Sequence, residues 1–494
     1  LILVRDPLGV KPLYYSHFRN SIIFASEIKA IFSMPGFSRK LNEQALYHYL
    51  TFANTPAPET IFRGIYKLEA GFYLKISKTL RIDKIIYWDP TTFKPNNHSL
   101  DEEDYINEIR RLLRQSVNRR MISDVPIGVF LSGGVDSSLN VALMSELMDR
   151  PVDTYSIGIK GDLFNEFKFA RQTAQLFSAN HHEIIIDEDD FVNFLRHMAF
   201  FQDEPLGDPV CVPLYYISKL ARDSGTTVIQ VGEGSDEIFS GYYIYRLFKI
   251  CEQNGYRYYL KLPEWVKSQM FRVANKLFNP LISDAFRRAS LNEPLFMGNA
   301  IAFWEVEKKQ LLKNCQDMIS SSQFIPTIES NFLSKDSLRN IINIELKNRL
   351  PELLLMRVDK MSMATSIETR VPFLDEDLVE FALKIPSGLK QKNGQNKYIL
   401  KKAAEGIIPD EIIYRKKWGF CGSATNILSD KIIAFAHEKV FKNSLILELF
   451  NKKYIEKIFE YHKKQRRFNS FKIWNLLNLV LWNEQWIEGI NQSN

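Results

Sequence analysis

The feature that most constrains the fold is an apolar run that leads directly into a loop of small residues. Val125 to Leu131 reads as a strand, the loop is Ser132-Gly133-Gly134-Val135-Asp136-Ser137-Ser138, and a helical pattern continues to Met148. Unpaired backbone N–H groups at the start of such a helix bind anions, helped here by the helix dipole and three serine hydroxyls. The segment therefore predicts a pyrophosphate-binding loop at the end of a sheet strand.

One acid stands inside this loop. Asp136 would repel a phosphate unless a cation lay between them, so its position predicts Mg²⁺ bridging carboxylate and phosphate oxygens. The alternative is a Gly-Gly turn with a capping aspartate and no ligand. A second loop at the same sheet edge favours the first interpretation.

That second loop is Val231-Gly232-Glu233-Gly234-Ser235-Asp236-Glu237, directly after a strand pattern at Thr227 to Val231. The carboxyl ends of parallel strands meet at one edge, where α/β sheets bind ligands. Alone, an acidic glycine-rich turn also fits a solvated loop. Together, Asp136 and Asp236 could hold Mg²⁺ on a pyrophosphate leaving group, which leaves Glu233 for acid–base work.

Strand and helix patterns alternate around these loops. Further strands are expected at 152–159 and 182–186, and helices at 165–177, 189–200 and 214–224. This alternation predicts an α/β fold with a parallel sheet covered on both faces. After residue 242 the pattern is predominantly helical, with helical spacing through 341–363.

The chain before this region has a different character. Residues 1–88 combine short strands with two short helices, which predicts an α+β unit. Residues 89–104 are rich in proline, asparagine and acids and read as a linker, because they cannot bury a face. We therefore expect a boundary there and a second unit over 105–494.

Composition excludes several classes of function. The 494 residues carry 64 basic and 58 acidic side chains without a dominant basic block, so charge gives no case for nucleic acid or a membrane. The apolar stretch 473–482 contains Asn475 and Asn478 and is too short to span a bilayer. Four scattered cysteines fit a reducing cytosol, which favours a cytoplasmic protein.

Both loops resemble those of glutamine-hydrolysing asparagine synthetases, and so do the segments 5–14, 24–30, 58–62 and 356–375. The resemblance covers nearly the whole chain. It implies an ATP-pyrophosphatase domain of the adenine nucleotide alpha hydrolase type with a helical C-terminal extension over 105–494. It also implies that residues 1–88 are the remnant of an α+β, N-terminal-nucleophile glutaminase domain.

The start of the chain departs from that family. Leu1 is not a methionine, and the family's amino-terminal cysteine is absent before it, so we expect a truncated chain that uses ammonium but not glutamine. Many relatives carry serine at Val231 and a Gly-Gly pair at Ser240-Gly241. The first departure should spare function, because the contact there is attributed mainly to backbone.

The resemblance implies roles for individual residues. Glu233 and Lys417 would be catalytic, the first supporting adenylate formation and ammonia attack and the second neutralising developing charge. Asp6 would recognise the amino group of glutamine, while Glu368 and Arg370 form either a structural ion pair or a contact supporting the reacting groups. ATP would be bound by Leu131, Ser132, Gly133, Gly134, Asp136, Ser137, Ser138, Ile157, Val231 and Gly232, and Mg²⁺ by Asp136 and Asp236.

These roles predict ATP-dependent conversion of aspartate to asparagine through a β-aspartyl-adenylate. Ammonia would come from glutamine in the intact protein, and a homodimer is compatible with the sequence. One alternative is amidation of another carboxylate, such as a sugar acid in surface-polysaccharide assembly or a β-lactam precursor. Another is a nucleotide-binding scaffold without turnover, against which the combination of Asp136, Glu233, Asp236 and Lys417 argues.

Overall fold

A five-stranded parallel sheet carries both glycine-rich loops in the computed structural model, which describes residues 1–94, 100–161, 166–322, 336–416, 428–464 and 469–489. All neighbouring strands pair in parallel. This confirms the predicted α/β fold. The strand order is β11 (Glu368–Arg370), β10 (Val228–Gln230), β7 (Ile127–Phe130), β8 (Asp153–Ile159) and β9 (Asn180–Ile186).

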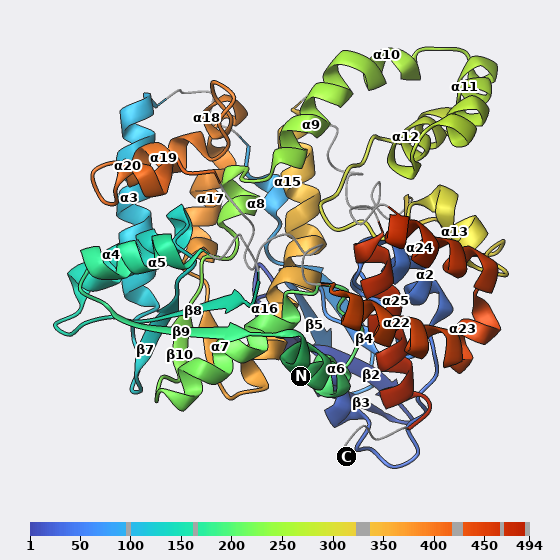
Figure 1. Ribbon diagram of the computed structural model, residues 1–494, viewed down its shortest axis with the longest axis horizontal. Helices are drawn as coiled ribbons and strands as arrows, with labels where there is room; N and C mark the ends of the chain where they lie inside the picture. The colour runs from blue at the N-terminus through green and yellow to red at the C-terminus, as the bar shows by residue number, and fades with distance from the viewer. Residues whose placement is uncertain (95–99, 162–165, 323–335, 417–427, 465–468, 490–494) are drawn as a thin grey trace.

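Helices cover both faces of this sheet, with α4 and α5 over one face and α7 over the other (Figure 1). Helix α4 begins three residues earlier than predicted, with Gly134 as its N-cap, so Asp136 and Ser137 lie in its first turn. The helices of this region are α3 (Glu102–Arg119), α4 (Val135–Leu147), α5 (Phe167–Leu176), α6 (Glu188–Gln202), α7 (Cys211–Asp223) and α8 (Ser235–Phe239).

The first residues form two small antiparallel sheets, as their strand patterns predict. One has the order β1 (Ile2–Val4), β5 (Phe72–Ile76), β6 (Ile82–Ile86), and the other β3 (Ser21–Ala25), β2 (Tyr14–Phe18), β4 (Tyr66–Lys67). Two helices accompany them, α1 (Ile28–Ile31) and α2 (Glu43–Phe52).

The segment predicted as a linker is partly ordered structure. Asp89 pairs with Lys347 at 2.9 Å, and a short 3₁₀ turn follows at Pro90–Thr92. Helix α3 begins at Glu102, inside the predicted linker, because Asp101 and Asp104 form a reciprocal capping box. Four of the acids that suggested a linker are therefore the N-cap of α3, Asp101, and the first-turn residues Glu102, Glu103 and Asp104. Residues 95–99 of the predicted linker lie outside the described residues.

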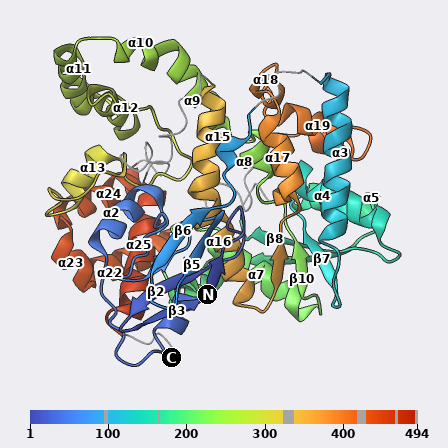
Figure 2. The same cartoon turned by 180° about the vertical axis from the view of Figure 1, so that it is seen from behind.

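The remainder is helical, as predicted. Figures 1 and 2 both place α10 to α12 away from the sheet and the last helices beside α2. The helices are α9 (Tyr243–Cys251), α10 (Arg257–Leu260), α11 (Glu264–Leu277), α12 (Pro280–Ser290), α13 (Glu305–Leu311), α15 (Ser337–Lys347), α16 (Leu355–Met363), α17 (Glu376–Lys384), α18 (Ser387–Lys390), α19 (Tyr398–Ala404), α20 (Asp410–Ile413), α22 (Asp430–Lys442), α23 (Ser444–Leu449), α24 (Lys452–Lys464) and α25 (Ser470–Trp486).

The late apolar stretch is a core helix. In α25, the buried Asn475 donates to the carbonyl of Phe471 at 2.8 Å, and Asn478 donates to Gln202 at 3.1 Å. These bonds use the N–H donors of both amides inside the core, and the Asn478 oxygen also accepts from the Tyr49 hydroxyl at 3.4 Å. Among the described residues, no helix combines the length and the apolar character that crossing a membrane requires.

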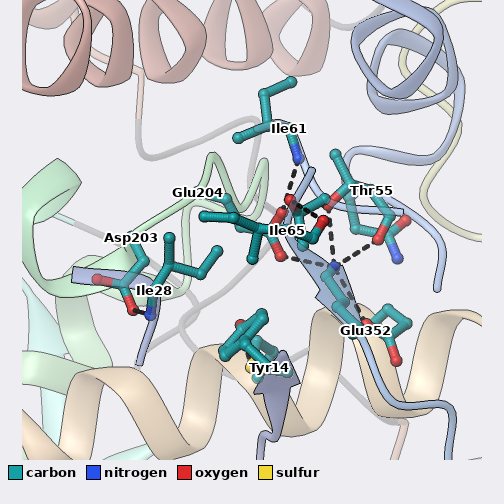
Figure 3. A network of polar contacts seen from close by, with 12 residues as sticks. Tyr14, Ile28, Thr55, Ile61, Ile65, Asp203, Glu204 and Glu352 are labelled. Atoms are coloured by element: carbon teal, nitrogen blue, oxygen red, sulfur yellow. Dashed lines mark hydrogen bonds and ion pairs between the residues drawn. The ribbon is translucent and has the colours of Figure 1, made fainter. Parts of the chain in front are cut away.

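A buried ion-pair cluster joins residues 1–88 to the rest of the protein (Figure 3). The Lys67 ammonium lies 2.6 Å from Glu204 and 3.1 Å from Glu352, and Arg5 lies 2.8 Å from Glu352. All four side chains are about 1% exposed. The hydroxyl of Thr55 donates to Glu204. The cluster therefore ties strand β4 and its neighbours to the loop after α6 and to the π-helical turn Leu350–Leu354, which leads into α16.

Candidate active site

A cavity of about 760 Å³ opens where the two glycine-rich loops meet. This size suits a small ligand or nucleotide. Eight predicted site residues line it: Ser132, Gly134, Asp136, Ser137, Val231, Gly232, Glu233 and Asp236. The structure thus brings together most of the residues that the sequence analysis predicts to bind nucleotide and Mg²⁺.

The first loop requires glycine at one position. Gly133 has φ +65°, and a Cβ there would lie 2.5 Å from the backbone nitrogen of Ala170. The loop closes on itself, because the Ser132 amide donates to the Ser137 hydroxyl at 3.2 Å. The Arg415 guanidinium, which lines the cavity, donates to the Gly133 carbonyl at 2.9 Å. The loop is therefore shaped before any ligand arrives.

Three predicted nucleotide residues lie behind or beside this loop. Ser138 is buried and its hydroxyl bonds Thr173 at 3.1 Å, so it joins α4 to α5 rather than completing the anion cradle. Leu131 is buried, with its amide donating to the Tyr155 carbonyl at 2.8 Å. Ile157 is half-buried on β8. The adenine contact expected of Ile157 stays a prediction.

The second loop packs directly against the first. A Cβ on Gly232 would lie 3.0 Å from the Cβ of Asp136, and Ser235 donates to the Asp136 carboxylate at 2.7 Å. Gly234 has φ +90°, with Leu374 where its side chain would be. Ser240, which departs from the family's Gly-Gly pair, adopts φ +63° and accepts from Gln391 at 2.7 Å, so serine is accommodated here.

A lysine that the sequence analysis missed lies between the two aspartates. The Lys397 ammonium lies 2.7 Å from a carboxylate oxygen of Asp136 and 2.7 Å from one of Asp236. Its side chain is only 4% exposed. Lys397 precedes α19 at φ +54°, a position that no motif marked, so only the fold reveals it.

The donor set suits Mg²⁺ in the presence of phosphates. Mg²⁺ is usually held by one or two carboxylates plus phosphate oxygens and water. Asp136 and Asp236 supply two carboxylates, and the ion would share their oxygens with the Lys397 ammonium that lies between them. Over the described ranges, no group of three or more His, Cys, Asp or Glu side chains is arranged to hold a metal by itself. The residues therefore fit an ion brought with a nucleotide better than an all-protein metal centre.

Glu233 is held by an arginine on α16. Arg357 lies 3.0 Å from Glu233 and also pairs with Asp208. Nearby, Glu237 is buried and accepts from the Tyr242 hydroxyl at 2.6 Å. Burial, opposed by Arg349, raises the pKa of Glu237 to about 7. Glu233 is thus a charge-paired carboxylate on the cavity wall, and Glu237 is a buried carboxyl that does not line the cavity.

Three other predicted residues, Asp6, Glu368 and Arg370, do not line this cavity. Arg370 donates to Glu368 at 2.7 Å and to the carbonyl of Arg120 at 3.0 Å, which supports the structural alternative for that pair. The Asp6 carboxylate accepts from backbone amides, including that of Val10 at 2.8 Å, as a turn residue does. Lys417 lies outside the described residues, whereas its neighbour Lys416 lines the cavity.

Comparisons with known proteins agree with the two-part architecture. A family model described as asparagine synthase matches residues 108–487, and one described as a glutamine amidotransferase domain matches residues 1–88. The chain is 34% identical over 493 residues to glutamine-hydrolysing asparagine synthetase 1 of Bacillus subtilis, covering 98% of this chain and 75% of that protein.

Two further relatives show the breadth of the similarity. Asparagine synthetase 3 of Bacillus subtilis is 28% identical over 84% of this chain and 64% of its own. The amidase chry2 of Gibberella zeae is 25% identical over 85% of this chain and 67% of its own. The asparagine synthase model matches most of the chain, and asparagine synthetase 1 of Bacillus subtilis is similar over 98% of it. Together with the two glycine-rich loops that meet at one cavity, these matches show that the chain belongs to the asparagine synthase family.

Proposed function

We propose that this protein amidates a carboxylate at the expense of ATP, and that aspartate is converted to asparagine through a β-aspartyl-adenylate. One observation carries this proposal: Asp136, Asp236, Lys397 and the amides of the first loop converge at one end of the cavity, and Glu233 stands on its wall. Family membership supports the same conclusion. Residues 105–494 would carry out the synthetase reaction. In the intact protein the ammonia would come from glutamine, through the glutaminase domain to which residues 1–88 belong.

The phosphate end of the cavity suits a pyrophosphate leaving group. A side-chain carboxylate oxygen of aspartate attacks the α-phosphorus of ATP, and the bond to the β-phosphate oxygen breaks. The helix start at Gly134 and the Lys397 ammonium would stabilise the negative charge that pyrophosphate gains. When bound, Mg²⁺ neutralises phosphate charge, and Asp136 and Asp236 would hold it.

The acyl end suits the second step. Ammonia attacks the activated acyl carbon, the bond from that carbon to the bridging oxygen breaks, and AMP leaves with that oxygen. The nitrogen must lose a proton, and Glu233, a carboxylate on the cavity wall, is placed to take part. Lys417 remains our proposal for a second cation at the reacting phosphate, next to Lys416.

The acceptor is open to one alternative. A relative named as an amidase matches 85% of this chain, so the family includes members whose names do not mention asparagine. A sugar acid or another carboxylic acid is therefore a second candidate acceptor, with the same adenylation chemistry.

The test is product formation from ATP, ammonium and a panel of carboxylic acids that includes aspartate. We expect AMP, pyrophosphate and asparagine in equal amounts with aspartate. AMP with a different amide would move the assignment to that acceptor. Formation of ADP, or nucleotide binding without turnover across the panel, would contradict the proposal.

A further inference from the structure

Arg357 joins two carboxylates that come from different loops. Its Nη2 lies 3.0 Å from an oxygen of Glu233, and its Nη1 pairs with Asp208. The arginine side chain is 11% exposed, Asp208 14% and Glu233 23%, so the pairs are largely shielded from water. A planar guanidinium contacting two carboxylates fixes both distance and orientation, which a lysine cannot do.

The charge of Arg357 is secure in this setting. Burial disfavours the cation, but Asp208 and Glu233 outweigh that effect, so the pKa of Arg357 is raised above its ordinary value. Glu233 therefore always faces a positive partner. Its carboxylate cannot swing into the cavity without giving up a shielded ion pair.

Asp208 is itself held rigidly. Its second carboxylate oxygen accepts from the Val210 amide at 3.0 Å, just before α7. The preceding Gly207 donates to the Ala53 carbonyl at 2.7 Å, and a Cβ on Gly207 would lie 1.9 Å from the Asn475 side chain. The loop at 203–208 is thus pressed between residues 1–88 and α25.

The other end of this loop is tied down by the buried cluster (Figure 3). Asp203 lies 2.7 Å from Lys360, which stands one turn after Arg357 on α16, and it accepts from the Ile28 amide at 3.0 Å. Glu204 lies 2.6 Å from Lys67. Both ends of the loop are therefore bonded to α16, and the loop is bonded along its length to residues 1–88.

We propose that Arg357 is a positioning residue for Glu233, and that Asp208 sets its guanidinium from a loop that residues 1–88 hold in place. The inference rests on the proposed role of Glu233 in amide formation. Its consequence is that the synthetase reaction depends on residues 1–88 through bonded contacts, whatever the source of ammonia.

The test uses the full chain with ATP, ammonium and the acceptor. Arg357→Gln should lower kcat roughly 10- to 100-fold with little change in KM for ATP, because Arg357 bonds Glu233 and Asp208, neither of which is proposed to bind ATP. Asp208→Asn should lower kcat less, and Arg357→Lys should restore part of the loss. Once Glu233→Gln has been made, adding Arg357→Gln should cost almost nothing more, since Arg357 acts through that carboxylate.

Arg119→Gln is the matched control, because this arginine also pairs with two carboxylates, Asp377 at 2.8 Å and Asp375 at 3.2 Å, but none of the three lines the cavity. It should keep full turnover. Additive losses from Glu233→Gln and Arg357→Gln, or a wild-type kcat in Arg357→Gln, would overturn the inference while leaving the proposed function standing.

Thermal unfolding tests the contact between Asp208 and Arg357 without an activity assay. Asp208→Asn and Arg357→Gln together should lower Tm by less than the sum of their separate effects, because both remove one contact. This reading holds even if the wild-type chain makes no amide, which would contradict only the proposed function. Fully additive Tm shifts would overturn the contact between Asp208 and Arg357.

Discussion

Two lysines in this protein each lie between two carboxylates, in surroundings of opposite kinds. Lys397 contacts Asp136 and Asp236 at 2.7 Å, and Lys67 contacts Glu204 at 2.6 Å and Glu352 at 3.1 Å. The aspartates beside Lys397 are about 15% exposed and line a cavity. The glutamates beside Lys67 are 1% exposed.

The comparison shows that a lysine between two carboxylates is not by itself evidence of a ligand-binding site. At Lys67, Thr55 and Arg5 satisfy the remaining carboxylate oxygens, so the cluster is complete without a ligand. At Lys397, two glycine-rich loops and a helix start face the same space, so phosphate oxygens could compete for the ammonium. We therefore assign the Lys67 cluster to stability and propose that the Lys397 cluster takes part in the reaction.

The largest effect should come from breaking the buried Lys67 cluster. Lys67→Met leaves Glu204 and Glu352 without this cation and should lower the free energy of unfolding by about 3–5 kcal/mol, as loss of one partner of a buried pair does. Denaturant unfolding measures it. Lys84→Met is the control, because Lys84 makes an exposed pair with Glu69 and should cost no more than about 1 kcal/mol. Equal effects would refute the contrast.

Breaking the Lys397 cluster should lower turnover more than stability. Lys397→Met removes a preorganised cation and should lower kcat by roughly a hundredfold or more, with a smaller loss of stability than Lys67→Met. Steady-state kinetics and denaturant unfolding on the same preparation separate the two quantities. Turnover near that of the wild type would return Lys397 to a structural role.

A third buried lysine sharpens the comparison through pH. Burial, opposed by Asp336, lowers the pKa of Lys390 to about 7. Between that value and its unfolded pKa, the unfolded chain holds a proton that the folded chain lacks. Stability should therefore rise from pH 7 to pH 9, by about 2 kcal/mol from this group. Unfolding at both pH values should show a smaller rise in Lys390→Met, and an unchanged rise would contradict this account.

The smallest effect concerns the metal. Asp236→Asn removes one charge from the proposed Mg²⁺ position and should raise the Mg²⁺ concentration for half-maximal turnover roughly tenfold. Glu368→Gln is the control, because that carboxylate pairs with Arg370 and lies on the sheet edge. An unchanged Mg²⁺ dependence in Asp236→Asn would remove Asp236 from the metal site.

The sequence predicted what depends on local pattern. The strand, the glycine pair and the following helix predicted the first loop, since these signals lie within a few residues of one another. Lys397 and Arg357 escaped functional assignment because each reaches its partner from more than one hundred residues away. Ser138 was placed in the anion cradle because a motif does not show which way a helical side chain points, and here it bonds Thr173.

Helix capping explains why part of the predicted linker is the start of a helix. Asp101 and Asp104 resemble linker residues in composition, yet they start α3 by bonding each other's backbone. The acids at residues 136 and 236 could be paired in advance because both loops follow parallel strands, whose ends meet. The Lys397 ammonium between these two aspartates could not be predicted, because no sequence motif marks that lysine.

The most direct test of the central claim follows oxygen from the acceptor to the nucleotide. Aspartate carrying ¹⁸O in its side-chain carboxylate is incubated with ATP, ammonium and the protein, and the products are analysed by mass spectrometry. Attack of that carboxylate on the α-phosphorus predicts one ¹⁸O in each AMP released with asparagine. Label in inorganic phosphate alongside ADP, or asparagine formed with AMP that carries no ¹⁸O, would contradict the adenylate and the account built on it.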